Sequence, residues 1–206
     1  QVVLMQADVV LLGAMSSTTE AGIYSVAARL VTVVTFGITA VNVILAPRIA
    51  SLYAEGRLDE LQQLVRLASW LVTGYALPVI AALAAGGKPL LGLFGPAFTS
   101  AYPVLMVLAV GQLAIVGAGS VGFLMTMTGF QKEATRVLVG SAAAAVVLNL
   151  WLIPRFGALG AAAGTVGGIA LRTVVLSILV RRNLGIAAGA VMFLMARPVT
   201  RVVRTP

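Results

Sequence analysis

The sequence predicts an all-α membrane protein, a polytopic transmembrane bundle of about six helices. Of its 206 residues, 60% are hydrophobic and only 10% are charged, whereas soluble domains carry about 25% charged residues. Several apolar stretches also approach or exceed the roughly 20 residues that a helix needs to cross the hydrocarbon layer. Gly, Pro and charged residues separate these stretches as short connections.

The first apolar stretch, residues 2–15, is partial and has no charged segment before it. We therefore expect a fragment without a signal peptide. Longer apolar stretches follow at 23–46 and 67–85. Residues 47–66 between them are too polar for lipid, and apolar side chains recur there at helical spacing. We expect a short helix lying on the cytoplasmic membrane surface, most simply as a connector.

The second half of the chain contains three more spans. Before them, residues 90–103 combine Gly, Pro and aromatic residues, which favours an outward interfacial or re-entrant loop. The tail, 187–206, is apolar but too short to span before its arginines, so it is interpreted as an interfacial helix or a truncated further helix. The three spans are expected at 104–128, 134–153 and 159–180, the last two separated by a turn at Pro154-Arg155-Phe156-Gly157.

The basic residues predict the orientation. The loops on one side hold seven Lys and Arg, whereas those on the other side hold Lys88 and Arg155. By the positive-inside rule, the loops near 47–66, 129–136 and 181–185 are cytoplasmic. The seven residues are Arg48, Arg57, Arg66, Lys132, Arg136, Arg181 and Arg182.

Composition also limits the chemistry. The net charge is +8, but the basic residues punctuate apolar runs, so membrane lipids rather than nucleic acid are the expected partners. The absence of Cys and His removes thiol nucleophiles, imidazole bases and the usual zinc or haem ligands. Neither a P-loop nor a GxSxG elbow occurs. We expect no enzymatic activity, no catalytic residue, no metal site and no cofactor.

Two charged residues lie inside predicted spans. Asp8 precedes the first outward loop by roughly 9 Å of helix and Arg29 follows it by roughly 10 Å, so both lie at similar depth. A lone charge at mid-bilayer costs about 2.5–3.5 kcal/mol, so each needs a partner or a wet cavity. One interpretation is an ion pair between the first two helices. In the other, Arg29 binds an anionic substrate while Asp8 positions it or takes up a coupling cation.

Three further polar residues are weaker candidates. Arg172 lies about eight residues before the cytoplasmic end of the last span, where its side chain either snorkels or binds substrate. Gln112 and Asn149 are amides within spans. They form hydrogen bonds between helices or, alternatively, face a sugar.

Glycines mark one face of the last span. Gly160, Gly164 and Gly168 form a GxxxGxxxG stripe, which allows another helix backbone to approach closely. We expect the stripe to pack the bundle rather than to bind a ligand.

The order of motifs along residues 7–186 resembles a known family. Six strings occur in sequence at family-like separations. They resemble those of the second half of the Wzx-type polysaccharide (O-antigen) flippases, in the multidrug/oligosaccharidyl-lipid/polysaccharide exporter superfamily. The strings are ADVVLLG from Ala7, EAGIYSVAARL from Glu20, APRIASLY from Ala46, LFGPAF from Leu93, MTG from Met127 and LNLWLIPRFGALGAA from Leu148.

This resemblance implies that residues 1–186 form the C-terminal lobe of a two-lobe flippase, beside an N-terminal lobe of the same protein. The implied function is to move undecaprenyl-pyrophosphate-linked oligosaccharide, for O-antigen, lipopolysaccharide or other polysaccharide, across the bacterial inner membrane by alternating access. The Asp8 and Arg29 motifs match family positions near the cavity, whereas Arg172 has no firm counterpart. A peptidoglycan-precursor flippase, a multidrug exporter of the superfamily and a non-transporting scaffold are the alternatives.

Overall fold

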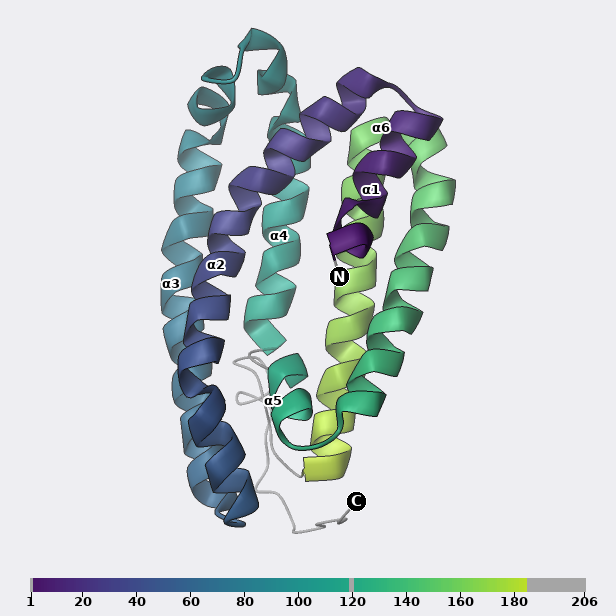
Figure 1. Ribbon diagram of the computed structural model, residues 1–206. Helices are drawn as coiled ribbons and strands as arrows, with labels where there is room; N and C mark the ends of the chain where they lie inside the picture. The colour runs from purple at the N-terminus through teal and green to yellow at the C-terminus, as the bar shows by residue number, and fades with distance from the viewer. Residues whose placement is uncertain (1, 119–120, 185–206) are drawn as a thin grey trace.

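The computed structural model describes residues 2–118 and 121–184 and confirms the predicted all-α bundle (Figure 1). Four helical stretches of this part are long and apolar enough to span a membrane. The elements are α1 (Val2–Met15), α2 (Thr18–Ala54), α3 (Leu58–Gly92), the 3-10 helix η1 (Pro96–Ala101), α4 (Tyr102–Ala118), α5 (Val121–Met127) and α6 (Gln131–Leu184).

Helix α6 consists of two antiparallel arms (Figure 1). The backbone leaves the helical region at Gly157, with φ 53° and ψ −131°, after Pro154. Glycine adopts this left-handed φ without steric cost, and proline cannot continue the backbone hydrogen bonding of the turn before it. We call residues 131–156 the first arm and 158–184 the second arm. They contain the predicted spans 134–153 and 159–180.

The connection between α2 and α3 differs from the expected surface helix. Both helices continue beyond the predicted spans and meet in a tight turn at Gly56, whose φ is +70°. The expectation is wrong because the apolar residues of this segment face the neighbouring helix instead of lipid. Leu61 and Val65 are buried in one cluster with Ile49 and Leu52 of α2. At the turn, Arg57 contacts Glu55 and Glu60 at 2.6 Å, and these carboxylates raise its pKa.

Two other predicted boundaries move. Helix α3 continues to Gly92, beyond the predicted end of its span at residue 85. Glycine at position 87 allows close packing there, since a Cβ would lie 2.8 Å from Leu105. The predicted span 104–128 is divided between α4 and α5, with residues 119–120 outside the described part. The predicted tail, 187–206, also lies outside the described residues.

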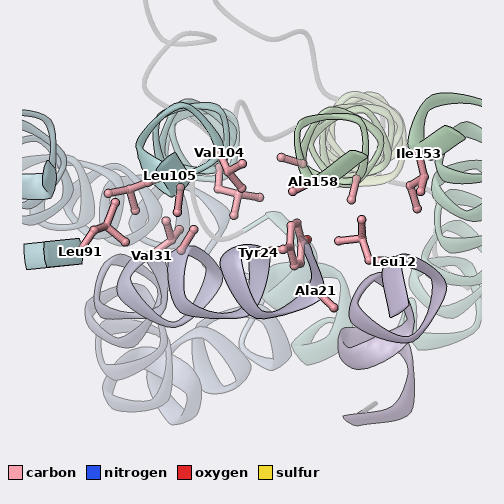
Figure 2. Close-up of a cluster of buried hydrophobic side chains, with 14 residues drawn as sticks. Leu12, Ala21, Tyr24, Val31, Leu91, Val104, Leu105, Ile153 and Ala158 are labelled. Carbon is pink, nitrogen blue, oxygen red and sulfur yellow. The ribbon is translucent and has the colours of Figure 1, made fainter. Parts of the chain in front are cut away.

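A buried apolar cluster joins α1 and α2 to α4 and α6. Figure 2 shows Leu12, Tyr24 and Val31 pointing toward side chains of α4 and α6. Large apolar side chains also remain on the outside, which suits a surface that meets lipid. Among the most exposed are Val10, Phe36, Ile44, Trp70, Val147 and Trp151.

The connections sort to two ends of the bundle, as the predicted topology requires. The α2–α3 and α5–α6 turns lie at one end, and the α1–α2 turn, η1 and the α6 break lie at the other (Figure 1). This arrangement agrees with alternating loops. Which end faces the cytoplasm stays a prediction from the basic residues.

That orientation can be tested with single cysteines, because the chain has no native Cys. An impermeant thiol reagent added outside is expected to label a Ser16→Cys variant and to leave a Lys132→Cys variant unlabelled until the membrane is opened. Ser16 is preferred to Ser17, whose side chain caps α2. Labelling of both variants from one side would contradict the topology.

Candidate functional site

Asp8 lies at the centre of a polar cluster built by three helices. Its Oδ1 accepts a hydrogen bond of 2.6 Å from Nδ2 of Asn149. Its Oδ2 lies 2.8 Å from Oγ1 of Thr165 and 3.1 Å from the hydroxyl of Tyr24. The two hydroxyls are 3.2 Å apart. We call Asp8, Tyr24, Asn149 and Thr165 the Asp8 cluster.

The two arms of α6 bring Asn149 and Thr165 together. The chain reverses at Gly157, eight residues from each, so both face α1 at the same level. Gly164 lies directly against Asn149, and a Cβ at this glycine would overlap the Oδ1 of that amide. The close approach of the arms therefore depends on glycine at this position.

The carboxylate of Asp8 is held by neutral donors. Within the described ranges, no Lys or Arg nitrogen lies within 4 Å of it. Asn149 is fully buried, and among the described residues its Oδ1 has no hydrogen-bond partner. This oxygen lies against Gly164, and a buried acceptor without a partner costs about 1–3 kcal/mol. The carboxylate of Asp8 is the charged group of the cluster and can attract a small cation.

Arg29 does not pair with Asp8, so the predicted ion pair is wrong. The sequence predicts a similar depth for Asp8 and Arg29, but Arg29 lies on a face of α2 that is turned away from Asp8. Arg29 follows Tyr24 by five residues, which turns its side chain by about 140° around α2. Tyr24 faces Asp8, whereas Arg29 is exposed.

Arg29 begins a line of polar side chains on the exposed side of α2. Thr32, Thr35 and Thr39 follow within an arc of about 120°. We call these four residues the polar stripe. A hollow of about 490 Å³ lies against it, lined in the described part of the chain by Thr32, Val33, Thr35, Phe36 and Thr39.

The threonines of the stripe are partly satisfied within the protein. Thr32 and Thr39 donate to backbone carbonyls of their own helix, as threonines in membrane helices commonly do. Thr35 donates to Oε1 of Gln112 at 3.3 Å, and this amide is buried between α2 and α4. The guanidinium of Arg29 is the charged group that the stripe presents.

Arg172 lies on the second arm of α6 and is half-buried. It follows Thr165 by seven residues, so it occupies nearly the same helix face about 10 Å farther along. The structure therefore places Arg172 away from the Asp8 cluster, and it forms no ion pair within the described ranges.

The glycine stripe lies where the arms of α6 meet. A Cβ at Gly160 would overlap the backbone carbonyl of Leu152, and one at Gly168 would lie 2.6 Å from Cβ of Ala145. Together with the contact of Gly164, these positions bring the second arm against the first along three successive turns.

Sequence reasoning missed Tyr24 and Thr165 as site residues. Tyr24 lies within a motif that carried the family resemblance, and Thr165 lies three residues after the last one. Neither is charged, so neither stood out inside a span. The available signal was indirect, because a carboxylate inside the membrane needs donors from neighbouring helices.

No protein-family model matches the chain. One relative is the probable flippase AglR of Haloferax volcanii, which is 28% identical over 170 residues. The match covers 81% of this chain and 36% of the relative, so the chain spans little more than a third of that protein's length. The chain thus combines three features: multi-pass α-helical architecture, a polar cluster in its interior, and sequence similarity to a probable flippase.

Proposed function

We propose that the chain is part of a membrane flippase that moves lipid-linked oligosaccharide by alternating access. The observation that carries this proposal is the polar stripe. Within the described part of the chain, Arg29 has no ion-pair partner, and it shares one side of α2 with three threonines, of which Thr32 and Thr39 are exposed. Helix α2 is long and apolar enough to span the membrane. A charge that faces hydrocarbon is costly, so this face is expected to border a water-filled cavity. Similarity to a probable flippase supports the same reading.

The composition of the stripe suits a phosphate-bearing cargo. A guanidinium binds phosphate oxygens through two parallel hydrogen bonds. A diphosphate head with sugars cannot enter hydrocarbon without losing its water partners, and a wet cavity replaces them. The polyprenyl tail remains in lipid while the head passes. An N-terminal lobe of the complete protein would form the opposite wall.

The Asp8 cluster supplies a place for coupling. A proton or cation bound at the carboxylate would weaken the hydrogen bonds that Asp8 accepts. Because the carboxylate on α1 accepts from α2 and from both arms of α6, binding there would change how these helices are held together. In this proposal, Asp8 couples an ion gradient to movement, and Arg29 contacts the cargo.

The alternatives differ in the charge they require of the cavity. A multidrug exporter should present carboxylates to cationic drugs, but Asp8 is engaged by three donors and Arg29 is exposed. A peptidoglycan-precursor flippase shares the diphosphate and polyprenyl groups and fits equally well. A non-transporting scaffold does not require an exposed arginine within the membrane. The expected bacterial location stays a prediction, since the relative is archaeal.

The test is Arg29→Ala in the complete protein expressed in its native host. Surface polysaccharide is expected to fall by roughly tenfold or more, since a lost hydrogen bond to a charged group is worth about 1.5–3 kcal/mol. Arg29→Lys should retain part of the activity, because lysine keeps the charge without the paired geometry. Membrane protein levels should stay near normal.

Arg48→Ala is the matched control, since this arginine is also exposed on α2 but lies near the end of the helix. It should leave transport unchanged. Normal polysaccharide in the Arg29→Ala strain would contradict the proposal.

A further inference from the structure

The end of the bundle that holds the α1–α2 turn and the break in α6 (Figure 1) carries a contact that local helix capping does not explain. Ser17 caps α2 and accepts a hydrogen bond from the backbone N–H of Glu20 at 3.1 Å. In a capping box, the glutamate at this position returns its carboxylate to the N–H of the capping residue. Here the carboxylate of Glu20 instead crosses to α6 and accepts from the backbone N–H of Ala158 at 2.5 Å.

Ala158 is the first residue of the second arm, immediately after the break at Gly157. The first N–H groups of a helix have no partner within it, and a carboxylate there is also favoured by the helix dipole. The site is built for close approach, because a Cβ at Gly157 would lie 2.6 Å from Oε2 of Glu20. Glu20 therefore fastens the start of α2 to the start of the second arm.

Both fastened segments lead directly to the Asp8 cluster. Tyr24 lies one turn after Glu20 on α2, and Thr165 lies two turns after Ala158 on the second arm. Their hydroxyls are 3.2 Å apart and both reach Oδ2 of Asp8. A sliding of either helix by one residue, about 1.5 Å, would break these contacts.

We propose that Glu20 is a positioning residue that sets the register between α2 and the second arm of α6, so that Tyr24 and Thr165 converge on Asp8. Its functional consequence rests on the proposed role of Asp8, but the register itself can be measured without transport. Removal of the Glu20 carboxylate frees the Ala158 N–H and loosens both hydroxyls at Asp8.

Two measurements on the purified complete protein test this role. Amide hydrogen exchange in a peptide that spans Ala158 and begins several residues before it is expected to accelerate about tenfold or more in Glu20→Ala, since the Ala158 N–H then lacks an acceptor. Glu20→Gln keeps an acceptor oxygen and should restore most of the protection. Asp59→Ala, which removes an exposed acidic residue from the first turn of α3, is the control and should leave this peptide unchanged.

The second measurement is a double-mutant cycle on the melting temperature. Thr165→Val should clearly lower the melting temperature in the wild-type background and lower it clearly less in the Glu20→Ala background. The reason is that the Thr165 hydroxyl, once its position is loosened, contributes less to stability. If Glu20→Ala does not accumulate, Glu20→Asp, whose shorter side chain weakens the contact, takes its place. Equal shifts in both backgrounds would overturn the proposal, as would unchanged exchange at Ala158. If exchange and coupling come out as expected while Asp8 variants transport normally, the proposed function fails and the positioning role stands.

Discussion

Transport is expected to collapse in an Asp8→Asn variant of the complete protein while the protein still folds and reaches the membrane. The substituted amide keeps one oxygen for Asn149, and its NH₂ faces the hydroxyl oxygens of Tyr24 and Thr165, which accept as well as donate. The cluster can therefore stay connected. What disappears is the negative charge that would hold a coupling proton or cation.

The measurement is surface polysaccharide relative to the level of protein in the membrane. A loss of roughly tenfold or more is expected, if the contact of a coupling ion with the carboxylate is worth as much as a hydrogen bond to a charged group, about 1.5–3 kcal/mol. Asp8→Ala should behave differently, because it leaves the amide of Asn149 without its acceptor and should also lower the amount of folded protein. Asp59→Asn, at an exposed site on α3, is the matched control. Full transport in Asp8→Asn would show that the carboxylate serves packing alone.

The contrast between Asp8 and Arg29 shows how far sequence alone could reach. Residue counts and apolar length fix how deep a side chain lies, because a helix rises by a constant 1.5 Å per residue. The sequence therefore predicts apolar helices in this order, and it predicts a similar depth for both charges. The direction of each side chain around its helix depends on which helices become neighbours, and that is decided by packing across the whole bundle.

The same limit explains the segment between α2 and α3. Leu61 and Val65 recur at helical spacing, and that pattern predicts an apolar face without saying what covers it. A membrane surface and a neighbouring helix satisfy it equally. The structure covers these residues with Ile49 and Leu52, so the helices extend beyond the expected span.

The hydrogen-bond partners of Asp8 could not be predicted from the sequence for a related reason. Asn149 was predicted to need a hydrogen-bond partner, but its contact with Asp8 joins residues 141 positions apart. Tyr24 and Thr165 are neutral and carry no signal of their own. Only the reversal at Gly157 and the close approach at Gly164 bring all four residues together.

A Gly164→Leu variant is expected to lose most of its folded protein in the membrane. Overpacking typically costs about 1–3 kcal/mol. The cost is greater here because the new side chain would displace the amide of Asn149, which is itself held by Asp8. Gly160→Leu should be at least as damaging, since its obstacle is the backbone carbonyl of Leu152, which cannot rotate away. Loss of transport should follow loss of protein, as measured by membrane level and melting temperature.

The control for this series is Ala163→Leu, on the exposed face of the same arm, which should be mild. Val166 is not a suitable control, because a Cβ at Gly111 of α4 would lie 2.5 Å from its side chain and a larger residue at Val166 would disturb this contact. If Gly164→Leu folded normally and only transport disappeared, the contact between the arms would be a moving interface. The arms would then slide during the transport cycle, and the glycines would be required for motion rather than for assembly.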